Sequence, residues 1–311
     1  MKGKLSWMIV RWTVATGAAL LLSVIAFAGR AASSEVPDTA YIQSFEKWKA
    51  EQTEDLKANW LSLVGLFWLK PGVNSFGSDA GNAIVFPKGR AHAGEFDLEG
   101  SQVMLKLRPE TRATIAGKPV TTATLDPDTS AHVTRVEMGT LRFHVIIRGQ
   151  RVGIRVRDTE SAASRNFKGM MFYPLDLSYR VTATWVPSEG QKTVEVPNAL
   201  GDVTSEPSPG LVVFKLNGEE LRLTALGGDA KTGLFFVFND LTTKNETYPG
   251  GRFLETDPVV DGKVVVDFNR AYNPPCAVTP YATCPLAPKE NRLSVAIPAG
   301  EKFDKAAHGQ H

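Results

Sequence analysis

The sequence predicts a mainly β protein, an antiparallel sandwich or a partly closed barrel with one amphipathic helix at its N-terminal end. After Pro71 the chain consists of short alternating apolar and polar segments. Gly, Pro, Asn and Asp separate these segments, and helical spacing is confined to the residues before 60. This pattern is typical of antiparallel strands joined by tight turns. We therefore expect a single β-rich domain over residues 60–303.

Residues 1–30 have the pattern of an export signal. Two lysines and an arginine precede an apolar stretch from Trp12 to Ala28, and the tripeptide at 26–28 offers a cleavage site between small residues. The alternative is an uncleaved N-terminal anchor, because the stretch approaches the roughly 20 apolar residues that cross a bilayer. We expect an exported protein, periplasmic or extracellular, that contacts a membrane only if this segment stays attached.

The charge of the chain argues against a nucleic-acid-binding protein. The sequence has 35 Lys and Arg against 33 Asp and Glu, and four of the basic residues lie within residues 1–30, where there is no acid. The remainder therefore carries 31 basic and 33 acidic side chains, a net charge of −2. Binding to nucleic acid depends on a clear basic excess, so we expect no nucleic-acid partner.

An amphipathic helix is expected over residues 38–58. Apolar residues recur there at helical spacing, with charged residues between them: Tyr41, Ile42, Phe45 and Trp48. The apolar run from Trp60 to Leu69 is too short to span a membrane and too apolar to be exposed, so we expect it in the core. The helix should pack against the β-rich body.

Two turn motifs predict hairpins with a defined register. Asn217-Gly218 suits a two-residue type I′ turn, which places Phe214 opposite Leu221 so that apolar side chains meet on one face. Asp261-Gly262 suits the same turn. It pairs Val260 with Lys263 and leads the strand at 264–267 into a proline-rich segment.

A third hairpin predicts a basic sheet face. Gly149-Gln150 suits a type II′ turn with glycine first. This register puts Phe143 opposite Val156 on an apolar face and His144 opposite Arg155 on the other face. The remaining pairs on that second face are Arg142 with Arg157 and Arg148 with Arg151.

The basic face requires an acidic partner. Like charges directly opposite each other destabilise a sheet by up to roughly 1 kcal/mol per pair. One solution is structural, with acids pairing to the arginines on a solvated face: Asp158, Glu160 or Glu137. The other is an anionic ligand, a carboxylate or phosphate held by the planar forks of Arg155 and Arg157. The sequence leaves both open.

The segment from Asp267 to Arg292 is the leading candidate for a functional site. It holds hydrogen-bonding and aromatic side chains among prolines that prevent a regular helix or strand. Long loops in compact domains are usually functional or disordered, and this composition argues against disorder. The candidate ligand-binding residues are Arg155, Arg157, Arg252, Asp267, Asn269, Arg270, Tyr272, Asn273, Glu290 and Asn291.

These residues predict one pocket, in which Arg155 or Arg157 approaches an acid or amide of the loop. The ligand would be small and anionic. The alternative is that the polar side chains only satisfy the hydrogen bonds of a loop with few backbone donors.

Cys276 and Cys284 are the only cysteines of the chain, and both lie in this loop. In an oxidising compartment we expect them to form a disulfide, which stabilises a loop of this size by about 2 to 3 kcal/mol in the chain-entropy model. A zinc site would need two further ligands from His92, His132 or His144, and a nucleophilic cysteine needs an accessible thiolate. We expect no metal and no cofactor.

No familiar catalytic motif identifies a reaction. The sequence lacks the signatures of common serine hydrolases, zinc proteases and nucleotide-binding proteins. Two hypotheses remain: a small-ligand site, with or without catalysis, and a non-enzymatic module that binds or supports the cell envelope.

Four segments resemble one known family. They are residues 63–69, residues 153–158, residues 251–254 and the run from Asp267 to Cys284 with its Ala-Tyr-Asn-Pro-Pro-Cys motif. Together they resemble the bacterial and archaeal family catalogued as domain of unknown function 1684, over roughly Phe45 to Lys302. The family carries no assigned reaction, so the resemblance implies homology and transfers no functional residues.

Overall fold

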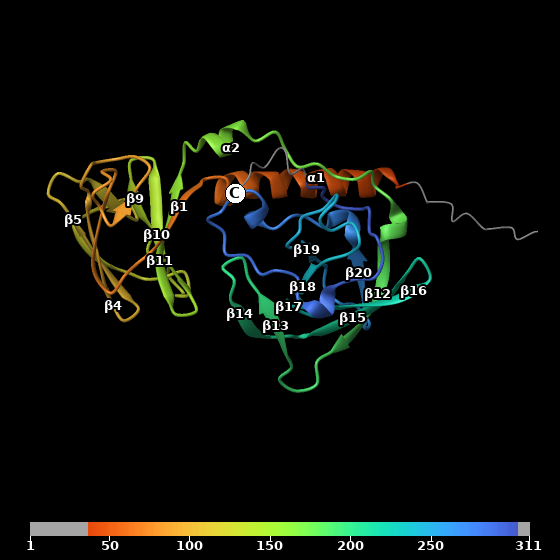
Figure 1. Ribbon diagram of the computed structural model, residues 1–311. Helices are drawn as coiled ribbons and strands as arrows, with labels where there is room; N and C mark the ends of the chain where they lie inside the picture. The colour runs from red at the N-terminus through yellow and green to blue at the C-terminus, as the bar shows by residue number, and fades with distance from the viewer. Residues whose placement is uncertain (1–36, 304–311) are drawn as a thin grey trace, which may run out of the picture. The chain divides into compact units, whose positions relative to one another are not determined.

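In the computed structural model, residues 37–303 are described, and they form a mainly β protein with one long helix at the beginning (Figure 1). This confirms the predicted fold class. No helix within these residues is long and apolar enough to cross a membrane. The expected export signal at 1–30 lies outside the described residues and stays a prediction.

Helix α1 (Thr39–Asp55) is the predicted amphipathic helix. Asp38 caps it, because its carboxylate accepts a hydrogen bond from the Tyr41 amide at 2.7 Å. Phe45 is buried, with its ring centre 5.4 Å from that of Phe172 on the body, so the helix packs as expected. The other helical segments are short: η1 (Leu56–Trp60), α2 (Ala162–Asn166), η2 (Leu177–Tyr179), η3 (Phe268–Arg270), η4 (Pro275–Ala277) and η5 (Lys289–Asn291).

The strands before residue 159 form two sheets. A six-stranded sheet has the order β1-β11-β10-β9-β6-β7 and contains β1 (Leu63–Trp68), β6 (Ala113–Ile115), β7 (Lys118–Val120), β9 (Val136–Met138), β10 (Leu141–Arg148) and β11 (Arg151–Asp158). A five-stranded sheet has the order β3-β2-β4-β5-β8 and contains β2 (Gly72–Gly77), β3 (Ile84–Val85), β4 (Gly94–Glu99), β5 (Gln102–Leu107) and β8 (Thr122–Leu125).

Side chains from both sheets share one hydrophobic cluster, as in a β-sandwich. Phe143 of β10 lies 6.0 Å from Phe76 of β2 and 5.7 Å from Phe96 of β4, measured between ring centres. All three are almost fully buried. Burying such rings is the main stabilising contribution in this part of the fold.

The strands after residue 179 form three further sheets. The four-stranded sheet has the order β16-β15-β12-β20 and contains β12 (Arg180–Pro187), β15 (Gly210–Leu216), β16 (Glu219–Thr224) and β20 (Lys263–Asp267). The three-stranded sheet has the order β17-β18-β19 and contains β17 (Gly227–Asp229), β18 (Gly233–Phe238) and β19 (Arg252–Glu255). The two-stranded sheet contains β13 (Thr193–Pro197) and β14 (Val203–Pro207).

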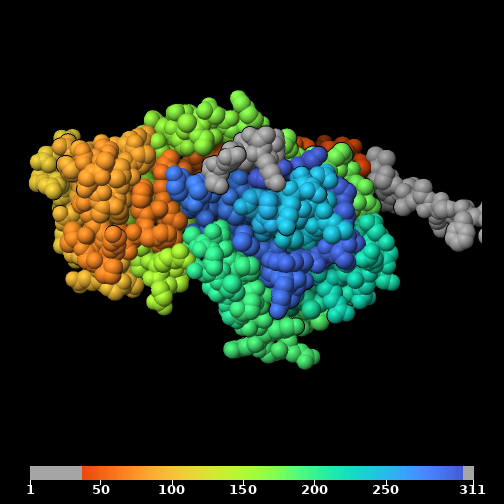
Figure 2. All heavy atoms as spheres, in the orientation of Figure 1, coloured from red at the N-terminus to blue at the C-terminus, as the bar shows by residue number. Residues whose placement is uncertain are grey.

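A second hydrophobic cluster is built from residues 183–299. It includes Phe214, Phe238 and Phe268, of which Phe268 begins the proline-rich loop. The expected domain at 60–303 thus contains two main clusters. Residues 188–192, between β12 and β13, form a loop that projects from the surface (Figure 2).

The three predicted hairpin registers are confirmed. His144 pairs with Arg155 and Phe143 with Val156 across β10 and β11. Phe214 pairs with Leu221 across the Asn217-Gly218 turn, and Val260 pairs with Lys263 across the Asp261-Gly262 turn. Asn217 and Asp261 both have positive φ, as the type I′ turn requires. The strand orders over residues 37–303 show open sheets and no closed barrel.

Candidate functional site

A cleft beside helix α1 brings together several of the predicted site residues, and we call it the α1 cleft. Its volume is about 410 Å³, within the range of ~300 to 1,000 Å³ that is usual for small-molecule sites. The helix contributes Tyr41, Ser44 and Trp48, whose spacing puts them on one helix face. The other lining residues are Arg180, Glu255, Thr256, Asp257, Val265, Asp267, Arg270 and Tyr272.

Asp267 lies at the centre of the polar wall. It is the last residue of β20, where it pairs with Arg180 of β12, and its carboxylate caps η3 by accepting from the Asn269 amide at 3.2 Å. The Tyr41 hydroxyl donates to both carboxylate oxygens, at 2.9 and 3.1 Å. The Asn269 side chain donates to one of them at 3.1 Å. These donors fix the carboxylate in one orientation.

Two guanidinium groups share this one carboxylate. Arg180 Nε lies 3.7 Å and Arg270 Nε 3.8 Å from Asp267 Oδ2, which are ion-pair distances but too long for hydrogen bonds. Arg270 also donates from Nη2 to Ser44 Oγ at 2.5 Å. Its buried Nε has no hydrogen-bond partner within residues 37–303. Around Asp267, two cations thus face one carboxylate and one donor is unused, while Glu255 and Asp257 lie elsewhere in the lining.

Aromatic rings hold the two arginines in place. The guanidinium carbon of Arg180 lies 5.7 Å from the centre of the Tyr41 ring, and that of Arg270 lies 5.9 Å from the centre of the Trp48 ring. Both distances are typical of cation–π contacts. The rings thus pre-orient the cations without neutralising them.

The phenol groups of the cleft act as hydrogen-bond donors. Tyr272 donates to Glu255 Oε1 at 2.8 Å. Burial, and then the charge of Glu255, raise the pKa of Tyr272 above its ordinary value, while burial and the charge of Asp267 do the same for Tyr41. Both hydroxyls therefore stay protonated near neutral pH, so they suit ligand binding better than proton abstraction.

A larger cavity, of about 730 Å³, lies near the β10–β11 turn, but its arginines are already paired. Arg148 contacts Asp128 at 2.8 Å, and Arg151 forms an ion pair with Asp202. Each cation there has its own carboxylate. The α1 cleft differs because two cations share one.

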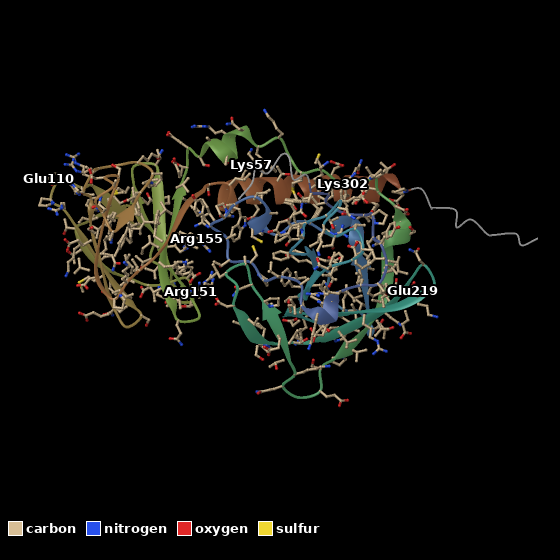
Figure 3. All side chains as sticks on the ribbon, in the orientation of Figure 1. Lys57, Glu110, Arg151, Arg155, Glu219 and Lys302 are labelled. Atoms are coloured by element: carbon tan, nitrogen blue, oxygen red, sulfur yellow. The ribbon has the colours of Figure 1, made fainter. Side chains whose placement is uncertain are left out.

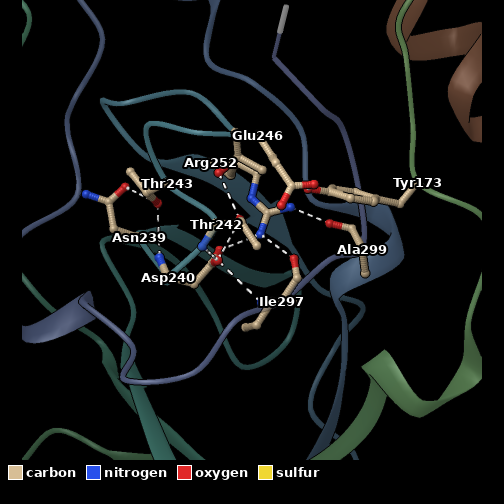
Figure 4. Close-up of polar contacts among 10 residues, drawn as sticks. Tyr173, Asn239, Asp240, Thr242, Thr243, Glu246, Arg252, Ile297 and Ala299 are labelled. Carbon is tan, nitrogen blue, oxygen red and sulfur yellow. Dashed lines mark hydrogen bonds and ion pairs between the residues drawn. The ribbon is translucent and has the colours of Figure 1, made fainter.

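Arg252, a predicted site residue, is instead part of a buried network (Figure 4). It is 1% exposed, and its guanidinium contacts Asp240 at 2.5 Å and the Ile297 carbonyl at 3.1 Å, with a further bond to the Ala299 carbonyl. Asp240 also accepts from the Thr242 amide at 2.7 Å. Arg252 therefore ties strand β19 to the C-terminal segment.

The three predicted asparagines tie down backbone. Asn269 bonds to both backbone groups of Asp176, at 3.1 and 2.9 Å. Asn291 bonds to both backbone groups of Thr224, each at 2.8 Å, and Asn273 donates to the Lys302 carbonyl at 3.0 Å. For these residues the geometry agrees with the structural alternative that the sequence left open, in which the polar side chains make hydrogen bonds that hold the loop in place. Glu290 is exposed and lies 4.0 Å from Lys289.

At the edges of the basic face, acidic side chains of the protein itself balance the positive charge. Arg142 pairs with Glu137 at 3.5 Å, as predicted. The predicted acids Asp158 and Glu160 pair with Lys88 instead, at 2.6 and 3.8 Å. Lys88 is distant in sequence, so its position could not be expected from the hairpin alone.

The centre of the face has no carboxylate within ion-pair distance among the described residues. Arg155, which Figure 3 labels on β11, is 5% exposed and donates to Thr283 Oγ1 at 3.3 Å. Arg157 donates to the Asn59 carbonyl at 3.3 Å. Burial, and then the charges of Arg157 and Arg155, lower the pKa of His144 to about 4, so this histidine is neutral at pH 7.

The basic face contacts the loop through the Thr283 hydroxyl and not through an acid or amide, so the single pocket stays a prediction. Arg155 reaches a hydroxyl at Thr283 and Arg157 a carbonyl at Asn59, whereas the α1 cleft is lined by Asp267, Arg270 and Tyr272. The loop is long enough for its first residues to face α1 while Thr283 faces β11. Of the ten predicted ligand-binding residues, the cleft therefore contains these three.

Sequence reasoning missed the other half of the cleft. Tyr41 and Trp48 were recognised as an apolar helix face, but their role as a cleft wall depends on where the helix packs. Arg180 reaches Asp267 only because β12 is the neighbour of β20. That strand order has no signal in a single sequence.

Cys276 and Cys284 are free thiols in this structure, and they are adjacent. The Cys276 amide donates to Cys284 Sγ at 3.3 Å. The disulfide therefore stays a prediction. Within the described part of the chain, no group of three or more His, Cys, Asp or Glu side chains is arranged to hold a metal ion.

Comparison with known proteins places the second half of the chain in a family. Residues 165–302 match the family described as "Protein of unknown function (DUF1684)". The chain belongs to the DUF1684 family. The matched region includes most of the α1 cleft but not α1 itself. No curated protein matches the chain.

Two solved structures are similar to parts of this DUF1684 protein. The solution NMR structure of an uncharacterised protein from Haloarcula marismortui is 34% identical, covers 45% of this chain and 80% of that chain, and has a TM-score of 0.38. A crystal structure of the FhaA FHA domain in complex with an intracellular domain is 16% identical, covers 30% of this chain and 97% of that chain, and has a TM-score of 0.22.

Proposed function

We propose that the protein binds a small polar ligand in the α1 cleft and that Arg180 and Arg270 hold an anionic group of this ligand. The observation that carries the proposal is the shared carboxylate: two guanidinium groups lie 3.7 and 3.8 Å from Asp267, and neither has a hydrogen bond to it. Arginine forks bind carboxylates and phosphates in pairs of parallel hydrogen bonds, so an incoming anion gains donors that Asp267 leaves free.

The rest of the cleft supports a ligand with a second, uncharged or basic part. Glu255 and Asp257 line the same cavity, and they accept hydrogen bonds or attract positive charge. The rings of Trp48 and Tyr272, 6.3 Å apart, offer apolar surface. A hydroxylated acid or a phosphorylated small molecule has this combination. The protonated phenols favour binding over general base catalysis.

A panel screen tests the proposal. The full chain is melted with phosphate, citrate, sugar acids and sugar phosphates, and at least one anion should raise the melting temperature in a concentration-dependent way. The double variant Arg180→Met/Arg270→Met should lose about hundredfold to ten-thousandfold in affinity for that anion, because it removes at least two charge-assisted hydrogen bonds that contribute about 1.5 to 3 kcal/mol each.

The matched control is Arg222→Met. Arg222 is exposed on β16 and pairs only loosely with Glu220, at 3.5 Å, so its loss should leave the affinity unchanged. Equal losses in both variants would show a non-specific charge effect and contradict the proposal. A panel without any binder would favour the non-enzymatic envelope module instead.

We also propose that the protein is exported, on the basis of the basic and apolar pattern of residues 1–30. Mass measurement of the protein from the cell envelope should show a chain that begins near Gly29. An intact N-terminus in the membrane fraction would support the anchor, and an intact N-terminus in the cytoplasm would contradict export.

A further inference from the structure

The cysteine pair lies in a setting built for chemistry at sulfur. Cys276 lies in the single helical turn η4, directly after Pro274 and Pro275 in the sequence, and it is partly exposed. Cys284 is 5% exposed and packs in a small cluster with Phe253. The Cys276 amide donates a hydrogen bond to Cys284 Sγ at 3.3 Å, so the two cysteines are adjacent. Cys276 is thus the more exposed of two adjacent cysteines.

Donors around Cys276 favour its thiolate. The neighbouring Cys284 thiol lowers the pKa of Cys276 against the opposing effect of burial, and the Tyr248 hydroxyl, which donates to the Cys276 carbonyl at 3.3 Å, lowers it further. The same contact raises the pKa of Cys284 far above its ordinary value, since a second negative charge beside the first is unfavourable. The pair therefore loses its first proton from Cys276.

A buried cation stands near the pair. Arg155 is 5% exposed, contacts Thr283 beside Cys284, and has a buried Nε without a hydrogen-bond partner among residues 37–303. Its charge also favours ionisation of Cys284, although less than the other effects oppose it. The remaining ionisable neighbour is Tyr272, whose pKa is already raised. A negative sulfur adds to the compensation that Arg155 receives from the charge of Asp128, which lies beyond ion-pair distance.

We propose that Cys276 and Cys284 form a reversible dithiol–disulfide pair, with Cys276 as the attacking sulfur and Cys284 as the resolving sulfur. The partner is a disulfide donor, either a small-molecule disulfide or an exposed disulfide of another protein. This inference is independent of the anion site, because none of its residues except Tyr272 lines the α1 cleft.

The exchange balances in two steps. The Cys276 thiolate attacks one sulfur of the donor, the donor disulfide breaks, and one donor thiolate leaves. Cys284 then gives up its proton and attacks Cys276 Sγ, which breaks the mixed disulfide and releases the second donor thiolate. The two cysteines lose two electrons and two protons, and the donor gains them. A dithiol reductant reverses both steps.

Trapping with glutathione disulfide tests the order of attack. The reduced full chain is exposed to glutathione disulfide and analysed by mass spectrometry after rapid alkylation. The wild type should pass to an internal Cys276–Cys284 disulfide that a dithiol reductant opens again. Cys284→Ser should accumulate a glutathione adduct at Cys276, and Cys276→Ser should form little adduct at the buried Cys284.

Alkylation of the native wild type supplies a readout that needs no substitution. At pH 7 Cys276 should react with iodoacetamide faster than Cys284, because it is the more exposed thiol and the one whose pKa is lowered. Tyr248→Phe should move the midpoint of the Cys276 rate profile to higher pH without lowering the melting temperature much, and a melt checks the fold of each variant.

Three outcomes would overturn the proposal. The first is two thiols that alkylate at equal rates and form no internal disulfide. The second is an adduct on Cys284 in preference to Cys276. The third is a disulfide that native protein cannot reopen with a dithiol reductant, which would make the bridge structural.

Discussion

Two arginine–aspartate sites in the second half of the protein differ in one respect that separates structure from function. In the buried network Arg252 has its own carboxylate, Asp240, at 2.5 Å, together with two backbone carbonyls. In the α1 cleft Arg180 and Arg270 share Asp267 at 3.7 and 3.8 Å. Both sites contain a buried Nε without a partner among the described residues, but only Arg270 borders a cavity. One-to-one pairing in the core holds the fold together, whereas the two-to-one pairing beside a cavity is the basis for the ligand site that we propose.

The largest expected effect comes from breaking the buried pair. Asp240→Asn removes the charge that compensates Arg252, and loss of one partner of a buried ion pair costs about 3 to 5 kcal/mol. Urea unfolding should show this loss. The matched surface variant Glu220→Gln, on an exposed pair, should change the free energy of unfolding by less than about 1 kcal/mol. Equal effects from the two variants would remove the distinction between the two sites.

A buried carboxyl near Arg252 predicts a pH dependence of stability. Burial raises the pKa of Glu301 from 4.5 to about 8, while its hydrogen bonds with Asn273 act in the opposite direction. A raised folded-state pKa gives stability that is complete below about pH 4.5 and is lost as the pH rises to about 8, since the unfolded chain releases the proton more easily.

The variant Glu301→Gln should remove this loss, so its stability relative to the wild type should increase between pH 4.5 and 8. The difference should reach the order of a few kcal/mol. Melting temperatures across this range measure it, and Glu290→Gln, at an exposed position, is the control. A constant difference between Glu301→Gln and the wild type over the whole range would contradict the raised pKa.

Replacing Asp267 in the α1 cleft should lower the stability of the fold and at the same time strengthen anion binding. Asp267→Asn keeps the acceptor for Tyr41 but removes the charge that competes with a ligand for Arg180 and Arg270. Unfolding should become easier by about 1 to 2 kcal/mol, as expected for a lost charge-assisted hydrogen bond. The best anion of the panel should bind more tightly. Weaker binding in Asp267→Asn would show that the carboxylate contacts the ligand directly.

The smallest effect is expected on the basic face. Arg157→Lys removes a hydrogen bond to the Asn59 carbonyl and should lower the free energy of unfolding by no more than about 1 kcal/mol. Anion affinity should not change, because Arg157 does not line the α1 cleft. A large loss of binding would restore Arg157 as a ligand-gripping residue, and titration of the same anion decides between the two results.

Local signals in the sequence were enough for the hairpins but not for the site. Glycine in Asn217-Gly218 and Gly149-Gln150 determines a turn, and the turn determines every pair in the strands beside it. The α1 cleft instead depends on contacts between Tyr41 and Asp267, which are 226 residues apart. No periodicity or turn motif encodes such a distance.

The α1 cleft contains predicted residues from the start of the loop, beside strand β20, and none of those predicted after Tyr272. Asp267 ends a strand whose direction was predicted, Arg270 and Tyr272 follow it, and all three line the cleft. Arg252 was predicted to belong to the same pocket, but its side chain lies in the core and pairs with Asp240. The face of a short strand that is buried depends on its neighbours, so the sequence could not distinguish the two.

The position of a bound anion tests the central claim most directly. A crystal of the full chain with the best anion of the panel should show it between the guanidinium groups of Arg180 and Arg270, within about 3 Å of their nitrogen atoms, as charge-assisted hydrogen bonds require. The same anion found at Arg155, or in the cavity beside Arg151, with the α1 cleft empty, would contradict the account.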